Sequence, residues 1–406
     1  MSPIPTVPSL RRLLALALST AAATAFAAGT PAPVKPPVPK PPASAPAPLP
    51  VINPGIARYL AIDIRSPANY ARPVLPVHYD AQVMKWQNTP HDNPVTDTGA
   101  TLGRVLFWDK RLSVDNAVSC ASCHQQGSSF GTTAQFSRGI HGQVGTAHAP
   151  GLANLVFYHG SAMFWDKRAP SAEAQATQPI VNPIEMGYDQ ANGGLPALLA
   201  KMQSLPYYPE LFTAVYGDPA ITEERIQRAL AQFERSMIAT QSRWDQGYAK
   251  VYNPALADKG LGLDVPGLTK QENAGRALFI GGPNGGGLGC AGCHQPPTFA
   301  LAPNALSNGL DAGETRIFKA PSLKSLAPGQ PMMHDGRFRT LEQVVAHYSL
   351  GVQNGPALDN RLKNRGGDVR VPNLSPADAA ALVAFLKTLN DPAFQADGRF
   401  GNPFRK

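Results

Sequence analysis

The sequence predicts a mainly α-helical protein in which one structural unit occurs twice. Gly103-Arg-Val-Leu-Phe107 lies 17 residues before the pattern Cys-Ala-Ser-Cys-His, and Gly275-Arg-Ala-Leu-Phe279 lies 15 residues before Cys-Ala-Gly-Cys-His. A unit of apolar helix, loop and C-x-x-C-H therefore repeats. Segments that alternate apolar and polar residues, as strands do, are scarce.

Local signals mark several helices. Thr269 and Glu272 form a capping-box pattern that predicts the start of the second repeated helix. Ser375 followed by Pro376 predicts the start of a C-terminal helix that runs through Leu389. Another amphipathic helix is expected from Thr222, with one apolar face made of Ile226, Leu230, Phe233 and Met237.

Composition limits the classes of function. The 406 residues suffice for about two domains, and 43% of them are hydrophobic, as in a globular protein. The formal net charge of +8 favours an anionic partner. Basic residues nevertheless form no run longer than pairs such as Arg11-Arg12, so no nucleic acid partner is expected.

The N-terminus has the pattern of an export signal. Arg11 and Arg12 precede a short apolar run that ends near Ala25-Phe-Ala27, and this predicts a signal peptide over residues 1–28. Residues 29–60 are rich in Pro and Ala and are expected to be a linker. The folded part is then periplasmic, whether the signal is cleaved or stays as an inner-membrane anchor.

The four cysteines all lie in the two C-x-x-C-H motifs. Two disulfides would each close a strained short loop and would leave both histidines unexplained. Zinc would need four ligands from neighbouring pairs, but the motifs lie 170 residues apart. Covalent haem c uses every position, because the thiols attach the haem and the adjacent histidine ligates iron. Two haem c groups are therefore expected, bound by Cys120, Cys123 and His124, and by Cys290, Cys293 and His294.

A helix before a haem motif, packed against a terminal helix, is the minimal plan of a cytochrome c. We therefore expect two cytochrome c-like domains, each with one covalent haem c. The N-terminal domain is placed at residues 92–255 and the C-terminal domain at residues 266–395.

Segments outside the haem motifs resemble the bacterial di-haem cytochrome c peroxidases over residues 92–392, nearly all of the predicted folded part. The similar segments occur in the family's order. They are Leu106-Phe-Trp-Asp-Lys-Arg-Leu-Ser113, Phe164-Trp-Asp-Lys-Arg168, Glu173-Ala-Gln175, Pro179-Ile-Val-Asn-Pro-Ile-Glu-Met186, Ala229-Leu-Ala-Gln-Phe-Glu-Arg235, Phe318-Lys-Ala-Pro-Ser-Leu323 and His334-Asp-Gly336.

The resemblance implies a periplasmic oxidoreductase that reduces hydrogen peroxide at the N-terminal, peroxidatic haem. Electrons come from a small cytochrome or copper protein through the C-terminal, electron-transfer haem. The resemblance implies that Glu185 is the catalytic acid and base, that Gln175 places the peroxide, and that Trp165 bridges the haems. A homodimer is compatible with the sequence. The alternative from another class is a non-catalytic di-haem electron carrier.

At the second haem the sequence resembles the MauG-like branch of the family. Counting from His334, the position of the far ligand falls on Tyr348, where other members have methionine. An anionic phenolate stabilises oxidised iron, whereas a thioether stabilises ferrous iron. The resemblance therefore implies the alternative of MauG-like oxidation of residues in a partner protein. Met332, Met333 and His347 are the competing ligands.

Two histidines depart from the family pattern. His141 is one residue out of register with a distal haem ligand, so we expect a five-coordinate first haem at rest. His148 replaces an asparagine that helps to bind calcium between the haems, and imidazole is a poor ligand for this hard cation. Calcium would then depend on the carbonyl groups of Gly329 and Pro331.

Overall fold

The computed structural model describes residues 54–160, 162–283 and 286–405, and this part is mainly helical, as the sequence predicts. Its α-helices are α1 (Pro54–Tyr59), α2 (Ala81–Met84), α3 (Asp97–Trp108), α4 (Cys120–Cys123), α5 (Ala172–Ala176), α6 (Gln178–Val181), α7 (Gly194–Ser204), α8 (Tyr207–Tyr216), α9 (Glu223–Arg235), α10 (Arg243–Val251), α11 (Lys270–Ile280), α12 (Leu341–Ala346), α13 (Pro376–Lys387) and α14 (Pro392–Ala396). The strands β1 (His294–Gln295) and β2 (Ala300–Leu301) form one antiparallel pair, with His294 opposite Leu301.

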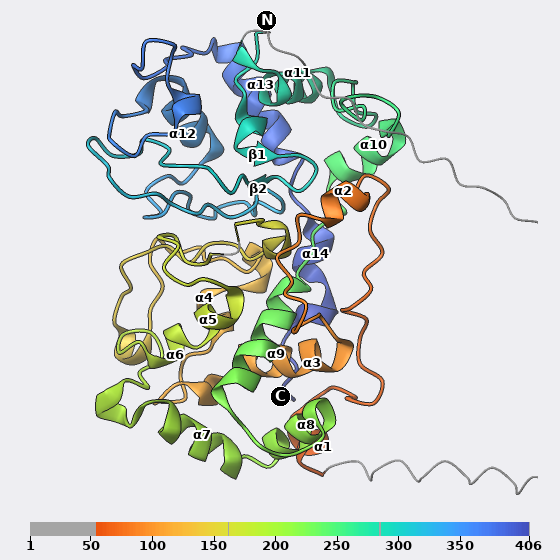
Figure 1. Ribbon diagram of the computed structural model, residues 1–406, viewed down its shortest axis with the longest axis vertical. Helices are drawn as coiled ribbons and strands as arrows, with labels where there is room; N and C mark the ends of the chain where they lie inside the picture. The colour runs from red at the N-terminus through yellow and green to blue at the C-terminus, as the bar shows by residue number, and fades with distance from the viewer. Residues whose placement is uncertain (1–53, 161, 284–285, 406) are drawn as a thin grey trace, which may run out of the picture. The chain divides into compact units, whose positions relative to one another are not determined.

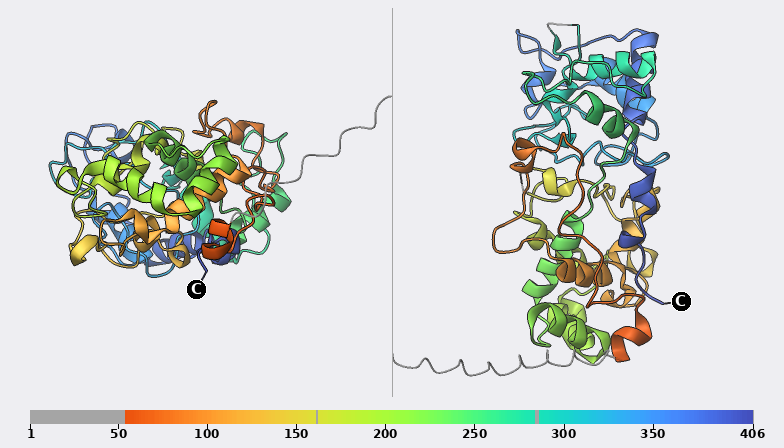
Figure 2. Two further views of the ribbon diagram at one scale, coloured as in Figure 1. Left: turned by 90° about the horizontal axis from the view of Figure 1, so that it is seen from below. Right: turned by 90° about the vertical axis from the view of Figure 1, so that its right-hand side faces the viewer.

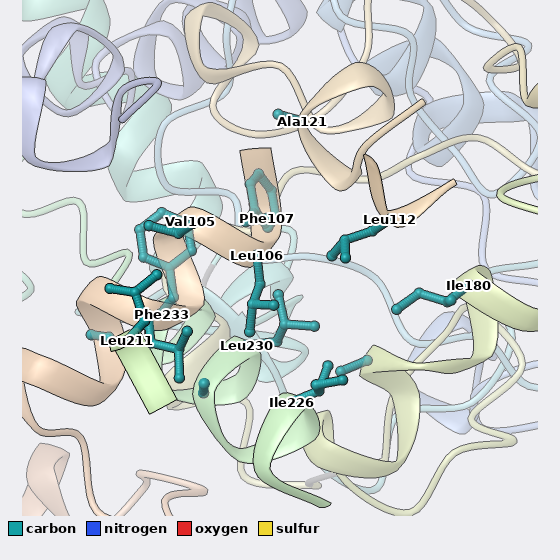
Figure 3. Close-up of a cluster of buried hydrophobic side chains, with 14 of the residues drawn as sticks. Val105, Leu106, Phe107, Leu112, Ala121, Ile180, Leu211, Ile226, Leu230 and Phe233 are labelled. Atoms are coloured by element: carbon teal, nitrogen blue, oxygen red, sulfur yellow. The ribbon is translucent and has the colours of Figure 1, made fainter. Parts of the chain in front are cut away.

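The first core forms where α3 packs against α9 (Figures 1 and 2). Figure 3 shows Leu106 and Phe107 of α3 beside Leu230 and Phe233 of α9, and all four side chains are buried. The helices approach closely at Gly103, because a Cβ there would overlap the carbonyl of Ala229. Only glycine permits such a close helix crossing.

The second core repeats this arrangement with α11 and α13 (Figure 1). Phe279 of α11 and Phe385 of α13 are in aromatic contact, with ring centroids 5.4 Å apart. Here Gly275 faces the carbonyl of Ala381, where again a Cβ would overlap it. The two repeated sequences thus place a glycine at the same kind of helix crossing.

The predicted helix starts are confirmed. The Thr269 hydroxyl accepts a hydrogen bond from the Glu272 amide, and the Glu272 carboxylate accepts one from the Thr269 amide. Ser375 caps α13 through the amide of Asp378. Thr222 caps α9 through the amide of Arg225. Each cap satisfies backbone donors that have no partner within the helix.

The two hydrophobic cores do not follow the predicted domain limits. α10 lies within the predicted N-terminal range 92–255, but its Trp244 is buried in the second core. Residues after α13 return to the first core, where Phe394 and Phe400 are buried. Local pattern marks helices but not the core that buries them, because burial depends on the tertiary path of the chain.

The predicted linker 29–60 is too long at its C-terminal end. Residues 54–59 form α1, and Ile56 and Leu60 are buried in the first core. The predicted signal peptide, residues 1–28, lies outside the described residues, as does the linker up to residue 53. Within the described part of the chain, no helix has the length and apolar character that a membrane span requires.

Candidate functional site

The first motif forms the short helix α4, and His124 follows it directly. The Ser119 amide donates a hydrogen bond to the Ser122 hydroxyl (3.0 Å), which fixes the start of the helix. Nδ1 of His124 lies 2.8 Å from the Phe130 carbonyl oxygen and 3.1 Å from that of Pro150. Because carbonyl oxygens only accept, Nδ1 carries the proton, and the Nε2 lone pair is left for a metal. This is the tautomer that a metal-ligating histidine with a free Nε2 requires.

The second motif begins as a 3₁₀ turn over Cys290–Gly292, and His294 starts β1. Burial lowers the pKa of His294 to about 4, so its imidazole is neutral at pH 7. Nδ1 of His294 is buried and makes no hydrogen bond within the described residues. Neutral imidazole is the form that ligates iron.

A large cavity lies against the second motif. Cys290, Cys293, His294 and Tyr348 all line it, and most of the remaining wall is apolar, including Phe279, Leu288, Leu301, Leu382 and Leu386. Both thiols are free, as covalent attachment of a haem requires. A large, flat, mainly apolar group with two thioether bonds and one histidine ligand fits this set of residues.

The charged groups around the two pairs of thiols differ. At the first motif, burial raises the pKa of Cys120, and the carboxylates of Glu234 and Glu185 raise it further. At the second motif, burial raises the pKa of Cys290 to about 12, and the guanidinium of Arg370 opposes the shift. Arg361 has the same opposing effect on Cys293. Carboxylates alone thus raise the pKa values of the first pair of thiols, whereas at the second pair the guanidinium groups of Arg361 and Arg370 oppose the rise and the Asp359 carboxylate adds to it.

Glu185 lies in the turn that follows α6. The Asn182 side chain organises this turn, because its oxygen accepts from the Ile184 and Glu185 amides and its nitrogen donates to Glu185 Oε1 (3.1 Å). Burial raises the pKa of Glu185, while the nearby Arg168 guanidinium opposes the rise. A half-buried carboxyl group with a raised pKa is suited to proton transfer near neutral pH.

Gln175 lies on α5, which packs against α9. An ion pair fixes this packing: Glu173 accepts from Arg235 Nη1 (2.5 Å) and Nη2 (2.9 Å), and from Asn93 (2.8 Å). The Gln175 amide is half-buried and makes no side-chain hydrogen bond to other described residues. It is therefore available to a ligand.

Trp165 lines the cavity at the second motif. Its indole Nε1 donates to the carbonyl oxygen of His148 (2.7 Å), and its ring meets the edge of the His334 ring at a centroid distance of 6.4 Å. His334 in turn stacks on Phe318, with centroids 4.0 Å apart. Trp165 is thus held in one orientation beside the predicted second haem.

Three of the four candidate axial residues reach the second cavity. Tyr348, Met332 and Met333 line it, and Asn308 Nδ2 lies 3.4 Å from the Tyr348 hydroxyl and 3.3 Å from the Met333 sulfur. His347 is not part of the lining, and its Nε2 is hydrogen-bonded to the Asn308 carbonyl (3.1 Å). Tyr348 itself lies in a π-helical turn, His347–Gly351, a feature often found at functional sites.

Sequence reasoning missed two charged residues, the buried Glu234 and the half-buried Lys319. Burial raises the pKa of Glu234 on α9 to about 7, and it lowers the pKa of Lys319 to about 8, with each charge opposing the shift of the other. Both lie inside segments that served only to establish the resemblance. A charged residue in an otherwise apolar helix face is the signal that could have identified Glu234.

The two histidines that depart from the family pattern lie in different surroundings. His141 is exposed and has a left-handed backbone conformation, with φ of 54°. His148 is buried, and its Nδ1 lies 3.2 Å from the Gln135 carbonyl oxygen.

The family model described as "Di-haem cytochrome c peroxidase" matches residues 97–252. The methylamine utilization protein MauG of Methylorubrum extorquens is 32% identical over 77% of this chain and 85% of its own length. A cytochrome c551 peroxidase of Nitrosomonas europaea is 30% identical over 71% of this chain and 79% of its own length.

Among solved structures, a MauG-like protein associated with microbial copper homeostasis is 28% identical, with a TM-score of 0.63. The match covers 83% of this chain and 99% of that protein. Membership of this group makes the chain an oxidoreductase enzyme and implies haem c cofactors, with hydrogen peroxide or a protein substrate as partner. The chain belongs to the di-haem cytochrome c peroxidase (MauG) family.

Proposed function

We propose that this protein reduces hydrogen peroxide at a haem held by Cys120, Cys123 and His124. Electrons reach that site through a second haem held by Cys290, Cys293 and His294. The single observation that carries the assignment is the placement of Glu185. Its half-buried carboxylate lies close enough to the first motif to raise the pKa of the Cys120 and Cys123 thiols. The groups around the second pair of thiols include no comparable carboxyl group with a raised pKa.

The haem supplies an iron atom at which the O–O bond of peroxide can be cleaved. With the haem in place, Glu185 in its carboxylate form would accept a proton from hydrogen peroxide and return it to the oxygen that leaves as water. Asn182 donates to Glu185 Oε1 and so holds the carboxylate in place for this transfer. Gln175 offers an unpaired amide to orient the peroxide.

Trp165 carries electrons between the two sites, because indole is readily oxidised and this ring lies on the wall of the second cavity. We propose Tyr348 as the far ligand of the second iron. Burial raises the pKa of its phenol to about 12 in the protein alone, and a bound ferric ion would favour the phenolate strongly.

The second candidate function is oxidation of residues in a partner protein, as in the MauG-like branch. Tyr348 favours it, because a phenolate-ligated haem stores oxidising equivalents better than a methionine-ligated one. The first candidate requires a small redox protein as electron donor instead. Turnover with a reduced cytochrome c or copper protein separates the two, and light scattering tests whether the protein forms the homodimer that the sequence allows.

The proposal also includes export of the protein to the periplasm and a calcium ion between the haems. Export to the periplasm follows from the pattern of residues 1–28, and N-terminal sequencing of the secreted protein tests it. Calcium between the haems would depend on the carbonyl groups of Gly329 and Pro331, since His148 brings imidazole to this region. Metal analysis of the dialysed holoprotein measures its occupancy.

The direct test is to add hydrogen peroxide to the purified protein with both haems attached and to follow the Soret band. We expect a rapid spectral change in the wild type and a much slower one in Glu185→Gln, which keeps the size of the side chain but cannot accept the proton. Ser137→Ala, near Cys123, is the control and should behave as the wild type. An unchanged Soret band in the wild type would indicate a plain electron carrier.

A further inference from the structure

A separate cleft borders the strand pair that carries His294. Its volume is about 310 Å³, near the lower end of the range for small-molecule sites. Two of its lining residues, Phe157 and Ala300, are buried, whereas Gln295 and Asn304 are exposed. The cleft therefore has a closed floor and a rim that is open to solvent.

The strands β1 and β2 separate this cleft from the second cavity. Paired residues of antiparallel strands point to the same face, and successive residues along a strand point to opposite faces. The paired residues His294 and Leu301 line the second cavity, whereas the next pair, Gln295 and Ala300, lines the cleft. Leu301 borders both spaces. A ligand beside Gln295 is thus one residue along the chain from His294.

The lining residues define the chemical class of the ligand. Among the ten described residues that line the cleft, none is Lys, Arg, Asp or Glu, so a charged ligand would lose hydration without gaining a counter-charge. Trp86 and Phe157 offer aromatic side chains against which a ring can pack. The Gln295 carboxamide at the rim can both donate to and accept from a hydroxyl group. A phenol, an uncharged ring with one hydroxyl group, meets these conditions.

We propose that this cleft binds a phenol and holds it as an electron donor to the second haem. The inference rests on the proposed haem at Cys290, Cys293 and His294, and it names a substrate class for that site. Each phenol loses one electron to the second haem and one proton to water at the open rim, and it leaves as a phenoxyl radical. Two phenols thereby supply the two electrons that, with two protons, convert one hydrogen peroxide into two water molecules at the first haem.

The first test measures binding to the protein with both haems attached, without peroxide. Isothermal titration calorimetry with 4-methylphenol should show saturable binding to the wild type. Gln295→Phe places an apolar ring in the cleft from an exposed position, where the fold tolerates a larger side chain, and it should abolish this binding. Gln190→Phe, at an exposed glutamine outside the cleft, is the matched control and should bind as the wild type does.

The second test adds hydrogen peroxide and follows the coupled products of 4-methylphenol by mass spectrometry. The wild type should form them, and the rate should saturate in the range of phenol concentration where calorimetry shows binding. Trp86→Leu removes one aromatic wall of the cleft, so it should raise the KM for 4-methylphenol more than it lowers kcat.

A free phenol and a tyrosine side chain of another protein share this chemistry, and N-acetyltyrosine amide distinguishes the two sources. Binding of both compounds would identify a cleft that admits a side chain with its backbone attached. Binding of 4-methylphenol alone would identify a free phenol as the donor.

Two outcomes overturn the inference. One is the absence of saturable 4-methylphenol binding to the wild type, which does not depend on the folding of any variant. The other is a Gln295→Phe protein that binds and oxidises 4-methylphenol as the wild type does. A protein that binds 4-methylphenol but whose Soret band does not respond to peroxide would instead refute the proposed function, so the two failures are distinguishable.

Discussion

The two C-x-x-C-H sites share a sequence pattern but differ in the hydrogen bonds of their histidines and in the charged groups near their thiols. At the first site, His124 is tied to two carbonyl groups and carboxylates lie near the thiols. At the second site, Nδ1 of His294 has no hydrogen bond in the described part of the chain and guanidinium groups lie near the thiols. Under the proposed function, the motif provides the attachment of a cofactor, whereas its surroundings divide the chemistry into proton transfer and electron storage.

The largest effect is expected when the haem attachment residues of one site are removed at a time. Cys290→Ala with Cys293→Ala should leave one covalent haem per chain that still reacts with peroxide but no longer accepts electrons from a donor protein. Cys120→Ala with Cys123→Ala should leave one haem that does not react. Mass spectrometry gives the haem count and stopped-flow absorbance gives the reactivity. Peroxide reactivity retained in the second variant would contradict the division of roles.

Glu185→Gln should produce the next largest effect. A positioned acid or base contributes roughly 100- to 10,000-fold to the rate, so kcat/KM for peroxide should fall by that order. Because the carboxylate is the active form and burial raises its pKa, wild-type kcat/KM should increase as pH rises through that raised pKa. The variant should lose this dependence. A variant with the wild-type pH profile would exclude Glu185 as the proton acceptor.

Tyr348→Met should change the second site alone. A thioether favours ferrous iron more than a phenolate does, so the reduction potential of the second haem should rise while that of the first stays unchanged. Met333→Leu is the matched control, because Met333 also lines the cavity. Potentiometry that shows no shift for Tyr348→Met and a large one for Met333→Leu would transfer the ligand role to Met333.

The smallest expected effect concerns stability at the first site. The Arg235 guanidinium lowers the pKa of Glu173 to about 2, so this pair stabilises the fold above pH 4.5 and loses its contribution as pH falls from 4.5 towards 2. That contribution is about 3 kcal/mol. Glu173→Gln should lower Tm at pH 7. It should also reduce the fall in Tm as pH drops below 4.5.

Glu342→Gln is the control for this measurement. It removes an exposed ion pair with Lys387, whose side chains are 59% and 63% exposed, and such pairs contribute little. Thermal unfolding followed by circular dichroism measures both variants. Equal Tm values for the two would show that the Glu173–Arg235 pair does not anchor α5.

Local sequence signals predicted much of the fold. The caps at Thr269 and Ser375 and the repeated glycines could be identified because each acts within a few residues of its own position. The placement of α10 in the second core and of α14 in the first could not, since burial of Trp244 and Phe394 depends on contacts far along the chain. Tertiary packing decides such cases.

The residues of the candidate site were inferred in two ways. The attachment residues follow from the motif, and Glu185, Gln175 and Trp165 followed from a family resemblance rather than from spacing. The presence of guanidinium groups at the second pair of thiols and not at the first was not predicted. Glu234, Arg361 and Arg370 are single charged residues without a motif, and the structure alone brings them to the cysteines.

The most direct test of the division between the sites is electron paramagnetic resonance of the resting, fully oxidised protein with both haems attached. The account predicts one high-spin ferric signal, from the haem at His124 with an open face beside Glu185. It also predicts one low-spin signal, from the haem at His294 closed by Tyr348, and Tyr348→Met should alter only this second signal. Two low-spin signals that peroxide leaves unchanged would contradict it.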